Sequence, residues 1–381
     1  MTQQLWTPEF RRIAVAYLLL FVSFYMLLPM VPFQMESQLD IPLRDTTLMM
    51  LLFVPGMLLV GPLMSYLLDV YRRKSVAMFS FIVMSLVTLG YGFVQAKEEF
   101  MLLCVVHGMA FQMASVAGMT LGIDVTNTLL RNEGNVRLVV STRLGMLLGV
   151  GIGVVVTRLF GFTTLLYASI LVGLVSILIL ARMYVPFRAP IEVQKFSSDR
   201  FFMWRGVVPA LNISFFTMMV GMLFSLQRTA CGEGIQVMEV VIPDLIFVAV
   251  GFLLMSVVML HVRTKRVLEL VVAGSVLFLA GFTGMNTFWS VPCMLLIGSG
   301  IGMVVPVLLR SLIQLSEHCQ RCTATATYQL SAETGVLLGI FLAVRVGHQE
   351  LYQVGVGVAA AALLFFVCIT YPYYKMMRRR D

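Results

Sequence analysis

The chain has 381 residues, of which 59% are hydrophobic and only 12% are charged, and its mean hydropathy is +0.93. A water-soluble domain of this length cannot bury so much apolar surface, whereas a lipid bilayer accommodates it in helices of about 20 residues each. The net charge of +8 fits basic loops that face an anionic lipid leaflet, and nucleic-acid binding is not expected. The composition therefore predicts a polytopic membrane protein.

Long apolar runs, separated by charged or turn residues, follow one another from the first residues to the last. Each run is long enough to cross a bilayer as a helix, so we expect an all-α fold with twelve transmembrane helices. Their expected limits are 13–33, 46–68, 75–95, 100–123, 135–157, 163–183, 205–226, 241–261, 267–286, 290–312, 323–344 and 350–373.

The positive charges separate cleanly between the two sides of this arrangement. With twelve spans, 22 of the 27 Lys and Arg residues fall on the side of the termini. Basic loops stay in the cytoplasm, so both termini are expected there, in a bacterial inner (plasma) membrane.

The chain divides into two similar halves. The longest loop, 186–204, lies at the middle and separates an expected six-helix bundle at 1–185 from a second one at 205–381. The loop "LLDVYRRKSV" after the second span matches "MLHVRTKRVL" after the eighth, and "GMLLG" in the fifth span matches "GVLLG" in the eleventh. Such internal repeats are typical of secondary transporters.

Three short motifs lie at the ends of expected spans. After the second span, Asp69, Arg73 and Lys74 match the motif G-x-L-A-D-R-x-G-R-K, and after the fourth span Asp124 and Arg131 match D-x-x-P-x-x-x-R. "RCTATATYQLSAETG", at the start of the eleventh span, is similar to a third pattern, R-G-T-A…D-x-G.

A fourth motif lies in the fifth span, where Gly145, Gly149 and Gly153 match the antiporter signature G-x-x-x-G-P-x-x-G and Val150 replaces its proline. Together the four motifs resemble those of the major facilitator superfamily, especially its drug- and sugar-efflux members, over essentially the whole chain. The resemblance implies two pseudo-symmetric six-helix bundles that move a solute by alternating access. It also implies a gating latch, in which Asp69 faces the start of the eleventh span and Arg73 pairs with Asp124.

Lys74 and Arg131 belong to the same motifs and are grouped with this latch. The alternative for the cluster is a basic anchor at the membrane surface without a gating role, which fits Lys74 better than Asp69.

Three ionisable residues lie within the apolar spans, where charge is costly and often marks a pathway or a proton relay. Glu333 and Arg143 occupy equivalent positions in the eleventh and fifth spans, 190 residues apart, and could pair until a substrate anion or a proton competes. The alternative is a static buried ion pair. His107, in the fourth span, is of a residue type that titrates near neutral pH and is a candidate for a proton path, although a lone histidine in an apolar helix is more often a hydrogen-bonded packing residue.

The resemblance also implies that the first, fourth, seventh and tenth spans line a central cavity. The residues expected to line it are Tyr17, Phe21, Tyr25, Gln112, Asn212 and Phe216. Small residues allow helices to approach closely. Gly145, Gly149 and Gly153 lie on one helix face, where we expect a sliding contact between the halves, and Gly335 and Gly339 are their counterparts in the second half.

The function expected from these features is secondary active transport of a small organic solute, with proton-coupled efflux favoured by the antiporter motif. Uptake by proton symport is the alternative, and a ligand sensor or scaffold that does not transport is another. No phosphate-binding loop, HExxH or GxSxG motif occurs, so we expect neither an enzyme nor a cofactor or metal site. The expected partners are the solute, protons and the bilayer, and one chain suffices as a monomer.

Overall fold

The structure is a computed structural model that describes residues 5–185, 195–196, 201–229, 242–261, 266–284, 290–316, 321–346 and 348–377. In these ranges every regular element is a helix, which confirms the predicted all-α fold. Eleven of these helical segments are long and apolar enough to cross a membrane. Most of the expected linker 186–204 lies outside the described residues.

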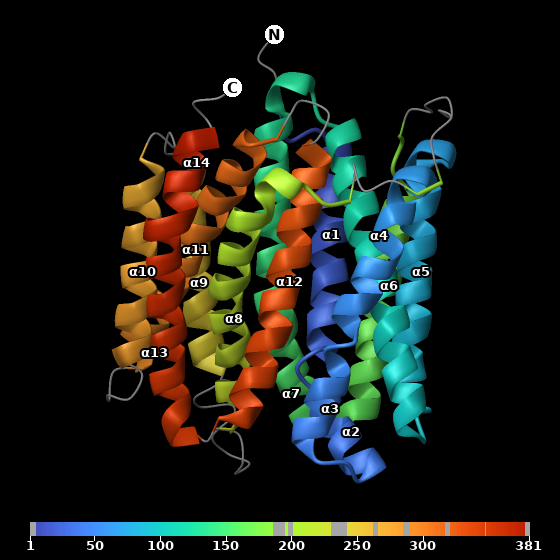
Figure 1. Ribbon diagram of the computed structural model, residues 1–381. Coiled ribbons are helices and arrows are strands. Elements are labelled where there is room, and N and C mark those ends of the chain that lie inside the picture. The colour runs from blue at the N-terminus through green and yellow to red at the C-terminus, as the bar shows by residue number, and fades with distance from the viewer. Residues whose placement is uncertain are drawn as a thin grey trace. The chain divides into compact units, whose positions relative to one another are not determined.

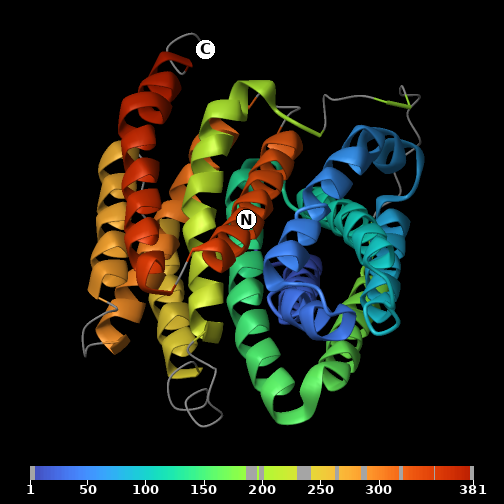
Figure 2. The ribbon, with the colours of Figure 1, turned by 60° about the horizontal axis from the view of Figure 1, so that its bottom comes forward.

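The longest helix accounts for the difference between eleven segments and the twelve expected spans. Helix α7 (Arg131–Ala181) has 51 residues, and Gly161 inside it has φ +83°. This backbone conformation suits glycine, which lacks the Cβ that would clash there. Figure 2 shows the two green segments of α7 meeting at a bend, so α7 supplies the expected fifth and sixth spans.

The chain forms two compact units, each described here by itself. The first unit comprises Met1–Met203 together with His318–Leu330, and the second comprises Trp204–Glu317 together with Ser331–Asp381. Helix α12 (Arg321–Arg345) therefore contributes its first ten residues to the first unit and the rest to the second. The expected division into two bundles at a linker stays a prediction.

Among the described residues, the first unit contains seven α-helices besides the start of α12 (Figure 1). They are α1 (Pro8–Leu27), α2 (Val31–Leu39), α3 (Leu43–Met50), α4 (Phe53–Val70), α5 (Arg73–Gly90), α6 (Lys97–Asp124) and α7. Helix α1 begins with a strong signal, because Thr7 Oγ1 accepts a hydrogen bond from the Phe10 N–H at 3.2 Å and Pro8 occupies the first turn.

The core of the first unit consists of α1 packed on α6 and α7, with α6 also packed on α4 and α5. An aromatic cluster fills the centre, where Phe111 of α6 stacks on Phe24 of α1 with ring centroids 4.3 Å apart. Phe21 and Phe53 lie 5.4 and 5.7 Å from the same ring. These contacts hold α1, α4 and α6 together.

The second unit repeats this plan. Its helices are α8 (Val207–Thr229), α9 (Ile242–His261), α10 (Val267–Gly284), α11 (Ser290–Gln314), the end of α12, α13 (His348–Phe365) and α14 (Tyr371–Met377). Helix α11 packs on α9 and α10, as α6 packs on α4 and α5. A short π-helical segment, Phe366–Thr370, joins α13 to α14 and continues the last span.

Candidate functional site

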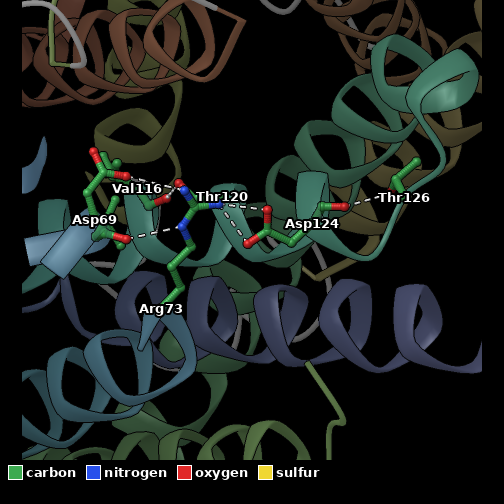
Figure 3. Close-up of polar contacts among 8 residues, drawn as sticks. Asp69, Arg73, Val116, Thr120, Asp124 and Thr126 are labelled. Atoms are coloured by element: carbon green, nitrogen blue, oxygen red, sulfur yellow. Dashed lines mark hydrogen bonds and ion pairs between the residues drawn. The ribbon is translucent and has the colours of Figure 1, made fainter. Parts of the chain in front are cut away.

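A cluster of charged side chains lies where α4 ends, α5 begins and α6 ends (Figure 3). Arg73 donates from Nη1 to both carboxylate oxygens of Asp124, at 2.7 and 2.8 Å, and its Nη2 lies 3.4 Å from Asp69 Oδ1. Its Nε donates to the Leu68 carbonyl at 3.1 Å. The Asp69 and Asp124 side chains are 1% and 5% exposed. The contact between Arg73 and Asp124 that the resemblance implies is therefore present.

The electrostatics of the three helix ends explain why the cluster needs an arginine. Asp69 and Asp124 lie at the C-terminal ends of α4 and α6, where the helix dipole disfavours negative charge. The guanidinium of Arg73 compensates both carboxylates, with Nη1 donating to both oxygens of Asp124 and Nη2 close to Asp69. This arrangement can act as an ionic contact that opens and closes.

Lys74 and Arg131 lie near this cluster in sequence but make different contacts. Lys74 Nζ donates to the carbonyl oxygens of Ala181 and Met183, at 2.7 and 2.8 Å, and so caps the C-terminal end of α7. Arg131 begins α7, and in the part of the chain that the structure describes it makes no ion pair. The structure thus brings together Asp69, Arg73 and Asp124, and not the whole predicted set.

Arg143 is buried, with 1% of its surface exposed, and it lies about 18 Å along α7 from the first residue of that helix, at 1.5 Å per residue. Its Nη2 donates to Gln329 Oε1 at 3.1 Å, and its guanidinium carbon lies 5.6 Å from the centroid of the Tyr328 ring. Both partners belong to the first ten residues of α12. A buried guanidinium beside an amide and a phenol is a set of groups that can bind an organic anion.

Glu333 lies on the part of α12 that belongs to the second unit, and it is 1% exposed. His107 is also buried, and its Nδ1 lies 3.1 Å from the Tyr91 hydroxyl. Its ring meets Phe24 and Phe53 edge-on, and its Nε2 has no hydrogen-bond partner among the described residues. These surroundings are largely apolar, and the ring is held by aromatic packing.

The three aromatic residues predicted for the first span are fully buried inside the first unit. The Tyr17 hydroxyl donates to the Ala114 and Ser115 carbonyls of α6 and accepts from the Met119 N–H at 3.0 Å. Phe21 stacks on Tyr25 with ring centroids 6.2 Å apart. Tyr17 therefore joins α1 to α6, and a role for any of the three in lining a cavity stays a prediction.

The remaining three predicted cavity residues differ in their hydrogen bonding. Gln112 is buried on α6, and neither atom of its amide has a hydrogen-bond partner among the described residues. Asn212 of α8 donates from Nδ2 to the Ala362 carbonyl at 3.0 Å, and Phe216 is buried on the same helix. An unsatisfied buried amide is costly, and a role of these three residues in lining a cavity stays a prediction.

The glycine motif holds α7 against α1. A Cβ at Gly145, Gly149 or Gly153 would overlap the α1 backbone, at Leu18, Val22 and Met26 in turn. This contact lies inside the first unit, so the expectation of a sliding face toward the other half is wrong for these glycines.

The counterparts in the second half behave in the same way. A Cβ at Gly335 or Gly339 would overlap the α8 backbone, at Ser214 and Met218. The predicted role in helix packing therefore has a defined partner helix in each unit.

Sequence reasoning missed Tyr328 and Gln329, the partners of Arg143, and it missed Arg310. Arg310 donates from Nη1 to the Met259 carbonyl at 3.0 Å and from Nη2 to the Leu260 carbonyl at 3.3 Å, and it thereby caps α9. The polar stretch "TATATYQ" inside an apolar span was a usable signal for the first two residues. Nothing local distinguishes Arg310 from the other basic residues of the loops.

Comparisons with known proteins agree with this fold. The family model of the Major Facilitator Superfamily matches residues 13–340. Among solved structures, the crystal structure of the human organic anion transporter MFSD10 (TETRAN) is similar, with a TM-score of 0.65 and 15% identity, covering 94% of this chain and 100% of that one. No curated protein sequence matches the chain.

The family match covers far more than half of the chain, and it agrees with the motifs after the second and fourth spans. At 15% identity the solved structure shows a shared fold and nothing about the solute. The chain belongs to the major facilitator superfamily and is a multi-pass membrane transporter rather than an enzyme.

Proposed function

We propose that the protein exports a small organic anion in exchange for protons, by alternating access. The observation that carries the proposal is the buried Arg143, whose guanidinium lies beside the Gln329 amide and the Tyr328 ring. A positive charge this deep in an apolar span is costly and often marks a substrate pathway. In this proposal Arg143 binds the anionic group of the solute. The solved relative described as an organic anion transporter is consistent with this solute class.

Glu333 is the proton carrier in this proposal. It is a buried carboxyl group in a membrane-spanning helix, and ionisable residues at such positions often belong to proton relays. Protonation and solute binding would then alternate, with the carboxylate taking a proton as the solute leaves. The ion cluster of Asp69, Arg73 and Asp124 serves as the latch that opens in each cycle.

The proposed orientation follows from the charges. Because 22 of the 27 Lys and Arg residues lie on the side of the termini, we place both termini in the cytoplasm and the protein in a bacterial inner membrane. We further propose that it acts as a monomer, because both halves of the repeat lie in one chain.

The test is transport by the purified chain in proteoliposomes that contain a pH-sensitive dye. Pooled organic anions should evoke a proton signal with wild-type protein, and Glu333→Gln and Arg143→Gln should abolish it. The matched controls are Glu269→Gln, whose side chain is 64% exposed, and Arg158→Gln, also exposed; both should transport like wild type.

The outcomes separate the proposal from its rivals. A proton signal of the opposite sign would identify uptake by symport. Anion binding without any flux in wild type would contradict transport and favour a sensor. Unchanged flux in Glu333→Gln would remove this residue from the coupling step.

A further inference from the structure

A small cavity lies inside the second unit, beside the π-helical turn of the last span. Its volume is about 10 Å³, and the residues that line it include Leu308 and Ser311 of α11 and Phe366 and Thr370 of the π-helical segment. All four are buried, at 2% to 6% exposed. The cavity is therefore a feature of one unit, where the π-helical turn meets α11.

The hydroxyl of Thr370 distinguishes this cavity. Thr370 Oγ1 is buried, and it has no hydrogen-bond partner among the described residues. Ser311, which lines the same cavity, behaves differently, because its Oγ donates to the Val307 carbonyl, four residues earlier in α11, at 2.9 Å. Hydroxyls within helices often donate to this i−4 carbonyl, and those of Thr217 and Ser275 in the same unit do so. Thr370 is an exception to this local rule.

The π-helical turn explains the exception. The carbonyl four residues before Thr370 is that of Phe366, and it accepts a hydrogen bond from the Tyr371 N–H, five residues after it. A π-helix pairs residues five apart instead of four, so the Phe366 carbonyl is engaged by the next backbone N–H and not by the threonine side chain. A buried hydroxyl lowers stability when no other group satisfies it. The turn therefore creates a need for a polar partner inside the cavity.

The size and the polar groups of the cavity suit one water molecule. A volume of about 10–15 Å³ is enough for a single water, which binds two to four polar partners. Thr370 Oγ1 can both donate and accept, and Ser311 Oγ can still accept while it donates to the Val307 carbonyl. The cavity, at about 10 Å³, is too small for a lipid chain or an organic solute. Water is therefore the ligand that both the volume and the hydroxyls select.

We propose that the second unit binds one ordered water molecule in this cavity, between Thr370 of the π-helical turn and Ser311 of α11. The water accepts from the Thr370 hydroxyl and donates to Ser311 Oγ, so it replaces the missing intrahelical hydrogen bond and joins the last span to α11. Tyr374, which also lines the cavity, makes a parallel link, because its hydroxyl donates to Gln314 Oε1 of α11. The proposal does not depend on which solute is carried.

Radiolytic hydroxyl labelling of the full chain in lipid nanodiscs, followed by mass spectrometry, detects such a water. X-rays convert bound water into hydroxyl radicals that oxidise the nearest side chains, so a buried residue is labelled only where water lies beside it. Phe366 and Leu308 of the cavity should be labelled severalfold faster than the controls. The controls are Phe278 and Ile297, which are as deeply buried in the same unit and are not among the residues that line the cavity.

Variants of the two hydroxyls test the assigned partners of the water. Thr370→Val keeps the shape of the side chain without its hydroxyl, and Ser311→Ala removes the other hydroxyl. Each should reduce the labelling of Phe366 and Leu308 to the level of the controls, whereas Thr370→Ser should be labelled like wild type. The water is refuted if Phe366 in wild type is labelled no faster than Phe278. Unchanged labelling in Thr370→Val would overturn the assignment of Thr370 as its partner.

Thermal unfolding in detergent is a second readout, because a hydrated hydroxyl and an unsatisfied one predict shifts of opposite sign. If Thr370 binds the water, Thr370→Val should lower the unfolding temperature by about 2 °C or more. If the hydroxyl is unsatisfied, the same change removes a costly buried polar group and raises the unfolding temperature, which would contradict the proposal. The controls are Thr283→Val, at an exposed hydroxyl of α10, and Gly357→Ala, whose Cβ would meet nothing within 4 Å; both should shift it little.

Discussion

Each unit joins two of its helices through a reciprocal pair of glycines, one on each helix. The pairs are Gly56 of α4 with Gly108 of α6, and Gly251 of α9 with Gly298 of α11. At all four positions a Cβ would overlap the backbone of the facing helix. The first members are 195 residues apart and the second members 190, so the two units repeat this contact at nearly one offset.

The polar helix ends differ between the units. In the first, Arg73 binds the carboxylates of Asp69 and Asp124. In the second, His261 stands 192 residues after Asp69, and Arg310 binds backbone carbonyls of α9. Both units therefore share the close glycine contacts. The first unit also has the ionic contact of Arg73 at the end of α4.

The largest expected effect is at the ionic contact. Arg73→Ala leaves two buried carboxylates without their cation, and because the arginine is 17% exposed we expect a loss of about 2–4 kcal/mol in the free energy of unfolding. Thermal unfolding in detergent measures it. Arg266→Ala, which breaks an exposed pair with Glu269, is the control. Equal unfolding temperatures for the two variants would contradict the larger contribution to stability that we assign to the buried contact of Arg73.

The glycine contacts should respond alike in the two units. Gly149→Ala and Gly339→Ala each drive a Cβ into the backbone of the facing helix, at Val22 and Met218, and overpacking of this kind costs about 1–3 kcal/mol. The same thermal assay should show similar losses for both, and no loss for Gly357→Ala. A loss in only one unit would break the equivalence of the repeats.

The caps on helix C-termini should have the smallest effects. Lys74→Gln and Arg310→Gln each remove a charged hydrogen-bond donor from carbonyl oxygens, of α7 and α9 respectively. Each loss should lower the free energy of unfolding by about 1 kcal/mol. If Lys74 also acts in the latch, Lys74→Gln should lower transport more than its effect on unfolding explains. Equal transport in the two variants would restrict Lys74 to capping.

The sequence predicted the features that depend on periodicity and short motifs. The spans follow from apolar runs of a length that only a bilayer requires, and the contact of Arg73 with Asp124 follows from motif positions. The reversal inside α7 was correctly placed between two spans, although no proline marks it.

Other features depend on tertiary contacts that no local pattern encodes. The break between α1 and α2 lies inside one apolar run, and the expected first span at 13–33 crosses it. The partner of Gly145 was misassigned because a small-residue face shows that a helix comes close but not which one. The ring of Phe201 packs on Gly61, 140 residues earlier in the chain, and the sequence offers no sign of this contact.

The most direct measurement is transport by charge-exchange variants at the end of α4. Arg73→Asp and Asp124→Arg each place like charges together and should reduce solute flux in proteoliposomes at least tenfold, while the double variant restores an opposite-charge pair and should recover part of it. Recovery in the double variant would support the ionic contact as the latch. If the single variants fold and transport at the wild-type rate, the contact is a static support and the account of the latch is wrong.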